Sequence, residues 1–231
     1  MISVRRAEER GRANFGWLDS QHTFSFGSYY DPQHMGFSAL RVINDDTVIP
    51  GAGFDTHGHR DMEIISYVLS GSIAHKDSEG NVQTLPAGEF QLMSAGRGIY
   101  HSEFNPSKTE ALRFLQIWIQ PNRMGGQPNY QQKDFGHELG LTPVATPDGK
   151  NGTLQIQQDA TLSQLILAPG ASQRLAVAPA RKVYVHHISG TLMLDSITLH
   201  PGDGAKVSDV SSLELRNISS DPVTALVFDL P

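Results

Sequence analysis

Short β-type runs separated by turn residues fill most of the sequence, and this pattern constrains the fold more than any other feature. The runs alternate with Gly, Pro, Asn and Asp, and few stretches carry apolar residues at helical spacing. Strands at such regular intervals are typical of a sandwich or a barrel. We therefore predict an all-β protein with strands at residues 37–43, 62–69, 72–75, 83–85, 90–93, 112–119, 153–157, 162–167, 182–188, 191–194, 213–217 and 223–228.

The two halves of the chain resemble each other weakly, which indicates a duplicated domain. Three segments of the first half recur in the second: 66–71 (SYVLSG) as 185–190 (VHHISG), 85–89 (LPAGE) as 199–203 (LHPGD), and 115–119 (LQIWI) as 226–230 (LVFDL). The offsets of 119, 114 and 111 residues are those of repeated strands joined by shortened loops. A Gly- and Pro-rich linker at 121–128 separates the copies, so we predict domains at 1–130 and 131–231.

The absence of Cys limits the chemistry that is open to this chain. With no Cys among 231 residues, disulfides, thiolate zinc sites, iron–sulfur clusters and a cysteine nucleophile are all excluded. A bound metal must therefore use His and carboxylate ligands. The formal net charge of -6 argues against a protein whose main task is to bind the phosphate backbone of nucleic acids, so we expect no direct nucleic-acid partner.

No segment has the character of a targeting or membrane sequence. Residues 1–11 carry charges of both signs and lack the apolar stretch of a signal peptide. The longest apolar segment, 112–119, is far shorter than the roughly 20 residues that span a bilayer. We expect a cytoplasmic protein that does not enter the membrane.

Two pairs of polar residues have the spacing of metal ligands. In a strand, residues i and i+2 point to the same face, so His57 and His59 can converge on one ion, and His101 and Glu103 can do the same. One such pair alone is more often two unrelated histidines, but two pairs beside Gly-rich segments favour a metal site. Imidazole and carboxylate suit Fe, Cu, Ni, Mn or Zn, and four protein ligands leave two positions of an octahedral ion open.

The second half of the chain lacks these ligands. The offset of 119 carries His57 and His59 to Ala176 and Ala178, and the shorter offsets carry His101 into 212–215, which contains no His. A metal site therefore belongs to the first half alone. We interpret the remaining histidines as surface or structural residues: His22, His34, His75, His137, His186, His187 and His200.

The residues around the two pairs resemble a known family. The order Gly51, His57, His59, Glu63, Gly71, Gly88, Gly96, His101 and Asn105 is similar to the two motifs of the cupin superfamily. The segments 94–103 (SAGRGIYHSE), 16–18 (GWL) and 23–26 (TFSF) resemble the pirins, which are bicupins similar to quercetin 2,3-dioxygenases. The resemblance is strong over 14–120 and weak after about residue 130.

This resemblance implies two tandem cupin β-barrels, of which the N-terminal one binds metal through His57, His59, His101 and Glu103 and the C-terminal one is degenerate. General cupins take their carboxylate from the first motif, which here would be Glu63, and Glu63 shares the strand parity of His57 and His59. The pirin pattern favours Glu103 instead and leaves Glu63 as a partner of a ligand or a salt-bridged strand residue. The implied cofactor is one divalent transition ion, with Fe(II) as first choice and Cu, Ni, Mn, Co or Zn as alternatives.

By the same resemblance, the protein is a metal-dependent dioxygenase that opens the ring of a flavonol such as quercetin with O2 and releases a depside and CO. Glu103 is the candidate base for the proton of the substrate hydroxyl. Two alternatives stay open: a metal-binding, redox-sensitive regulatory protein that acts through protein partners, and a different small-molecule enzyme on the same scaffold. We expect a monomer, because a second barrel can cover the sheet face that single cupins bury by dimerising.

Overall fold

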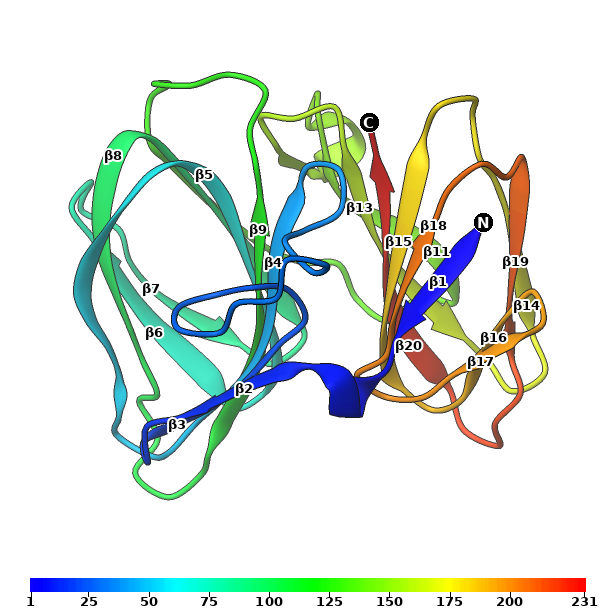
Figure 1. The fold of residues 1–231 in the computed structure, drawn as a ribbon. Coiled ribbons are helices and arrows are strands. Elements are labelled where there is room, and N and C mark those ends of the chain that lie inside the picture. Colours follow the sequence, from blue (N-terminus) through cyan, green and yellow to red (C-terminus); the bar gives the residue numbers. More distant parts are fainter. The chain divides into compact units, whose positions relative to one another are not determined.

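The computed structural model describes residues 1–231 and consists of strands, with two short 3-10 helices and no α-helix (Figure 1). This confirms the prediction of an all-β protein. The chain divides into two compact units. The N-terminal unit comprises Gly11–Phe135 and Ile156–Gln158, and the C-terminal unit comprises Met1–Arg10, Gly136–Gln155 and Asp159–Pro231.

The N-terminal unit is one nine-stranded sheet. Its strands run in the order β2-β3-β4-β9-β5-β8-β6-β7, and β10 pairs with β8 off this path. Their bounds are β2 Gly11–Asn14, β3 Leu18–His22, β4 Leu40–Val48, β5 Gly53–Ser70, β6 Ser72–Asp77, β7 Val82–Pro86, β8 Glu89–Phe104, β9 Leu112–Ile119 and β10 Asn129–Asp134.

Two unusually long strands, β5 and β8, organise this sheet. They pair antiparallel along most of their length, and the register shifts between Phe54 and His57 and again between His59 and Asp61. Such irregularities bend a strand and increase its local twist. The second half of β5 therefore pairs with β9 as well, while the second half of β8 pairs with β6. The strand pair that carries both predicted ligand pairs thus lies at the centre of the unit.

The C-terminal unit consists of a seven-stranded and a four-stranded sheet. The strand orders are β1-β18-β15-β20-β13-β11-β12 and β14-β19-β16-β17. The bounds are β1 Ile2–Arg5, β11 Gly140–Thr146, β12 Leu154–Gln155, β13 Thr161–Leu167, β14 Ser172–Ala176, β15 Lys182–Ser189, β16 Leu192–Leu194, β17 Ile197–Leu199, β18 Gly204–Val207, β19 Ser212–Asn217 and β20 Val223–Leu230; the 3-10 helices are η1 Ala7–Glu9 and η2 Lys150–Gly152.

Strand order supports the predicted duplication. The run β4-β9-β5-β8 of the N-terminal unit has the same connectivity as β13-β20-β15-β18 of the C-terminal unit. A buried asparagine directly follows β8 in the first copy, and another ends β19 in the second. The Asn105 side chain donates to the carbonyls of Val48, Ile49 and Glu110, and the Asn217 side chain donates to those of Leu167 and Asp221. These two asparagines give a fixed point for comparing the units.

The first strand of the chain belongs to the C-terminal unit. β1 pairs antiparallel with β18, so the blue strand runs beside it (Figure 1). The Arg6 guanidinium and the buried Asp203 carboxylate add an ion pair of 2.7 Å. This grouping differs from the predicted division into 1–130 and 131–231, because Met1–Arg10 join the second unit and residue 130 lies inside β10, which pairs with β8. Sequence similarity between the copies did not reveal this exchange, because β1 has no counterpart in the repeat.

We expect Asn217→Ala to lower the free energy of unfolding by about 1 to 3 kcal/mol, because it leaves buried carbonyl groups without donors. The Asn217 side chain is fully buried and also accepts hydrogen bonds from the Ser219 amide and hydroxyl. The urea midpoint of the C-terminal unit reports the effect. The exposed Asn129 supplies the control substitution to Ala, and equal midpoints for the two variants would contradict the assigned role.

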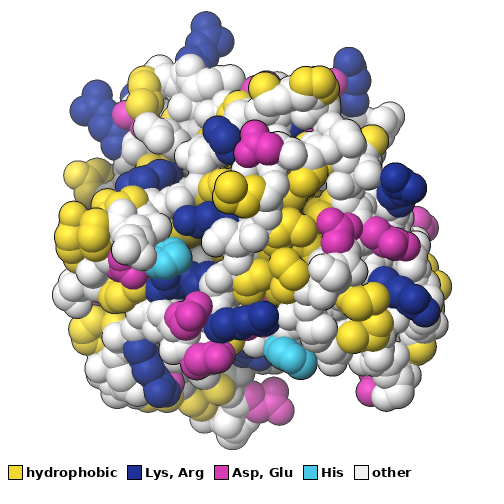
Figure 2. Space-filling view, turned by 45° about the vertical axis from the view of Figure 1, so that its right-hand side comes forward, with side chains coloured by type: hydrophobic (Ala, Val, Ile, Leu, Met, Phe, Trp, Pro, Cys, Tyr) yellow, Lys and Arg dark blue, Asp and Glu magenta, His cyan; other side chains and the backbone are white.

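Charged side chains of both signs are interspersed on the face that Figure 2 shows, without a continuous basic patch on that face.

The structure contains no helix with the length and apolar character that crossing a bilayer requires.

Candidate metal centre

Three imidazoles converge inside the N-terminal unit. His57 on β5 stands directly opposite His101 on β8, and their Nε2 atoms lie 2.9 Å apart. The Nε2 atom of His59 lies 3.1 Å from that of His101. Since His57 and His59 alternate on one strand face, both reach the same point, as their spacing predicted. The structure therefore brings together three of the four predicted ligands.

Local contacts orient the His57 ring, and burial sets the charge of His59 and His101. Nδ1 of His57 lies 2.7 Å from the backbone oxygen of Asp55. Because a carbonyl oxygen only accepts, Nδ1 donates this hydrogen bond, and Nε2 is the nitrogen that faces His101. In the metal-free protein, burial, together with the neighbouring imidazoles, lowers the pKa of His59 to about 4 and that of His101 to about 2. Both rings are thus neutral at pH 7, which is the form that binds metal.

The fourth predicted ligand, Glu103, lies deeper in the unit. One carboxylate oxygen falls within 4.8 Å of nitrogen atoms of His101 and His75, whereas His57 and His59 form their group with His101 alone. The carboxyl group accepts only long hydrogen bonds, 3.5 Å from the Ser66 hydroxyl and 3.4 Å from the Gln116 amide. Burial, and then the nearby Asp46, raises the pKa of Glu103 to about 7. This carboxyl group is weakly held and gains or loses a proton near neutral pH.

Glu63 has a different environment, and the parity argument for it fails. A register shift between His59 and Asp61 interrupts the strand alternation between His59 and Glu63, and Asp61 has a φ of 63°. The Glu63 carboxylate accepts 2.9 Å from the Ser94 hydroxyl and 3.1 Å from the Gln157 amide. Burial raises its pKa to about 7. Glu63 joins neither group of possible metal ligands.

The donor set fits a transition metal. The Nε2 atoms of His57 and His59 lie 2.9 and 3.1 Å from that of His101, and the nearby Glu103 carboxyl group accepts long hydrogen bonds of 3.5 and 3.4 Å. Nδ1 of His101 is buried and makes no hydrogen bond. Imidazole and carboxylate ligands are those of Fe, Ni, Cu, Mn and Zn sites.

Aromatic rings and a surface pocket flank the cluster. The Trp118 ring stands edge-on to His59 at 5.2 Å between centroids, and the Phe54 ring lies 6.3 Å from that of His57. A pocket of about 660 Å³ is lined by Gly58, His59, Arg60, Arg97, Gly98, Ile99 and Tyr100. The two arginines make this pocket more polar than a purely apolar substrate site.

The C-terminal unit carries leucines at positions where the N-terminal unit carries predicted ligands. His101 lies four residues before Asn105, and Leu213 lies four residues before Asn217. In the same way, Glu103 and Leu215 each lie two residues before the asparagine of their unit. Both leucines are buried in the core of the C-terminal unit. The second copy therefore has apolar packing at these two positions of the predicted ligands.

The structure also corrects one step of the sequence alignment. Leu175 on β14 pairs with Leu213 as His57 pairs with His101, so Leu175 rather than Ala176 takes the place of His57. The offset at this point is therefore 118 residues, because the loops between the strands differ in length. The conclusion that the second copy lacks ligands is unaffected.

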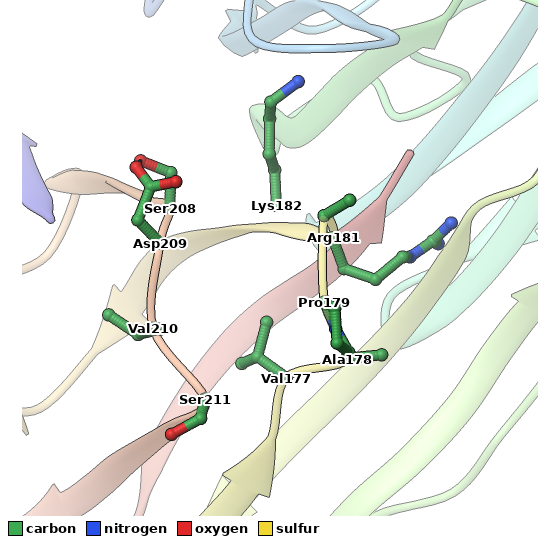
Figure 3. A pocket seen from close by; sticks show the side chains of 10 residues that line it. Val177, Ala178, Pro179, Arg181, Lys182, Ser208, Asp209, Val210 and Ser211 are labelled. Atoms are coloured by element: carbon green, nitrogen blue, oxygen red, sulfur yellow. Dashed lines mark hydrogen bonds between the residues drawn. The ribbon is translucent and has the colours of Figure 1, made fainter.

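A pocket of the C-terminal unit has different chemistry. It has a volume of about 320 Å³ and lies between the segments Val177–Lys182 and Ser208–Ser211, which face each other in Figure 3. Arg181 forms ion pairs of 2.8 Å with both Asp159 and Asp229. The lining contains no imidazole, so it is not a counterpart of the metal centre.

Sequence reasoning missed His75 and Asp77. His75 was interpreted as surface or structural and without a carboxylate at ligand spacing, but it is 1% exposed and its Nε2 atom lies 2.8 Å from a carboxylate oxygen of Asp77. The available signal was the spacing itself. His75-x-Asp77 is a third alternating pair, on β6, with the same spacing as the two pairs that were recognised.

Comparison with known proteins identifies the family. Residues 3–119 match the family model Pirin, and residues 143–230 match the quercetinase C-terminal cupin domain. A quercetin 2,3-dioxygenase of Escherichia coli K12 is 47% identical over 100% of this chain and 99% of its own length. A pirin-like protein of Caulobacter vibrioides is 39% identical over 90% of this chain and 91% of its own length.

Solved structures agree with the sequence relatives. The bacterial pirin YhhW from Escherichia coli in complex with nickel(II) has a TM-score of 0.97 and 47% identity, covering 100% of this chain and 99% of its own. A quercetin 2,3-dioxygenase from Acinetobacter baumannii, at 19% identity and a TM-score of 0.76, shares the fold over 98% of this chain and 85% of its own. The predicted two-barrel architecture is confirmed, and the chain belongs to the pirin family.

Proposed function

We propose that this protein is a metal-dependent dioxygenase that opens the ring of a flavonol such as quercetin, consumes one O2 and releases a depside and one CO. The observation that carries the proposal is the convergence of the Nε2 atoms of His57, His59 and His101 beside the buried carboxyl group of Glu103. The names of the relatives point to the same chemistry. A divalent transition ion held there supplies Lewis-acid and redox chemistry.

In this proposal Glu103 is both the fourth ligand and the base. Its carboxyl group has no hydrogen bond shorter than 3.4 Å, so a change of rotamer toward the three imidazoles costs little. A pKa of about 7 makes the group able to take the proton of the flavonol hydroxyl at neutral pH. Trp118 and Phe54 supply aromatic surface beside the cluster for the rings of the substrate.

The test is the stoichiometry of CO release and O2 consumption with quercetin. The purified protein is stripped of metal and loaded separately with Fe(II), Cu(II), Ni(II) or Mn(II), with Fe(II) as the expected native ion. We expect one CO for each O2 in at least one loaded form and none in the stripped protein. Stoichiometric metal binding without CO in any form would overturn the proposal and favour a metal-dependent regulatory protein; other enolisable aromatic compounds test the choice of substrate.

A further inference from the structure

A third pair of alternating polar residues faces the predicted ligands from the neighbouring strand. On β6, His75 stands directly opposite Glu103, and Asp77 stands directly opposite His101. β8 therefore has the imidazole of His57 on one side and this pair on the other. The pair lies where it can set the orientation of the β8 side chains.

The pair is buried and firmly anchored. The side chains of His75 and Asp77 are both 0% exposed, and Nε2 of His75 lies 2.8 Å from Oδ2 of Asp77. The Asp77 carboxylate also accepts from the amide groups of Glu79 and Asn81 at 3.0 Å each, and from the Asn81 side chain at 2.9 Å. The turn of the β6–β7 hairpin therefore fixes Asp77, and Asp77 fixes the His75 ring.

The His75 ring in turn contacts the predicted ligands. It stands edge-on to the His101 ring at 5.4 Å between centroids and also packs against the Tyr130 ring at 4.7 Å. A nitrogen of His75 lies within 4.8 Å of one of His101 and of a Glu103 oxygen. Because Nε2 is bonded to Asp77, Nδ1 is the nitrogen left free, and it is buried without a hydrogen-bond partner.

The duplicated unit shows which residues change together with the ligands. β16 pairs with β19 as β6 pairs with β8, and Leu194 stands opposite Leu215 as His75 stands opposite Glu103. His75 thus corresponds to a leucine, as do the predicted ligands His57, His101 and Glu103. The asparagines that brace the strand ends remain in both copies. A histidine needed only for barrel architecture would be expected in both copies as well.

We propose that His75 and Asp77 act as a positioning pair that holds the His101 ring and the Glu103 carboxyl group in the arrangement that binds the metal. This inference rests on the proposed metal site. Hydrogen-bonded partners behind metal ligands fix ligand orientation, and their removal typically costs about 10- to 100-fold in metal affinity. His75 contacts the His101 ring by packing, and one of its nitrogens lies within 4.8 Å of a Glu103 oxygen.

The test uses His75→Leu, which installs the residue of the C-terminal unit, together with Asp77→Asn and the double variant. Ni(II) affinity is measured by titration, the ligand field by the visible absorption of the Co(II)-loaded protein, and folding by the thermal midpoint of the metal-free protein. His137→Ala is the control, because His137 is exposed. We expect the two single variants to lose about 10- to 100-fold in Ni(II) affinity and to shift the Co(II) bands.

The outcomes separate this inference from the proposed function. If the wild-type protein binds no Ni(II), the metal site itself fails. If it binds Ni(II) while both single variants bind within about threefold of it, with unchanged Co(II) bands and a lower midpoint, the pair is only structural and the inference is overturned. Residues that act as one unit give non-additive effects, so the double variant should lose no more than the worse single variant. Additive losses would also contradict the pair, and Asp77→Asn carries the test should His75→Leu not fold.

Discussion

His101→Ala is expected to lower metal affinity by more than about 100-fold and to leave no detectable CO release from quercetin. Removing a residue that only supports a metal ligand typically lowers the affinity by about 10- to 100-fold, and removing a ligand itself should lower it further. His101 is the residue shared by both groups of possible ligands, and its Nε2 atom lies within 3.1 Å of those of His57 and His59. Without it, the two remaining imidazoles both lie on β5, and β8 offers no imidazole opposite them. Ni(II) titration and CO detection measure the two effects.

The fold should survive this substitution well enough for the test. The apolar core of β8 beside the site includes the fully buried Phe90, Leu92 and Met93, and none of them changes. Circular dichroism of the metal-free variant checks this, with the exposed His137→Ala as the matched control. A His101→Ala protein that binds one Ni(II) with wild-type affinity would show that the cluster is not the metal site.

Glu103→Gln is expected to reduce flavonol turnover by about 10² to 10⁴-fold while the protein stays folded, which is the usual contribution of a general base. The amide has nearly the shape of the carboxyl group and keeps its packing, but it cannot take the proton of the substrate. Single-turnover rates at saturating quercetin and metal separate this effect from weaker metal binding.

The matched control is Glu63→Gln, which changes a second buried carboxyl group with a similarly raised pKa of about 7. Glu63 is held by Ser94 and the Gln157 amide and joins neither ligand group, so we expect less than about a tenfold loss from this variant. A larger loss from Glu63→Gln than from Glu103→Gln would move the role of base to Glu63. Wild-type turnover in Glu103→Gln would remove the role from Glu103.

Properties of single strands could be predicted from the sequence. The strand at 112–119 has the predicted bounds, and the alternation of His57 with His59 does place both imidazoles on one face. The repeat was visible because strands with buried side chains tolerate little change, while loops shorten freely. The degenerate second copy followed from the same comparison.

Features that depend on pairing between distant segments could not be predicted. The bulge at Asp61 invalidates the parity argument for Glu63. Asp adopts a positive φ more readily than most residues, but the residue type alone does not predict one. The predicted strand 72–75 ended before Asp77, whereas β6 includes it. The pair of His75 and Asp77 was therefore not recognised, although the two residues have the same i, i+2 spacing as the other pairs. The exchange of β1 into the C-terminal unit has no local sequence signal at all.

That exchange has a consequence for folding during synthesis. Ile2 pairs with Val207, so β1 leaves the ribosome long before β18, the strand with which it pairs. At the usual rate of synthesis this delay lasts about 10 to 40 s. The N-terminal unit can assemble in the meantime, because its pairings lie within Gly11–Phe135 and Ile156–Gln158. The metal-binding unit is therefore able to mature first, while an unpaired Ile2–Arg5 strand remains exposed to other nascent chains until β18 arrives.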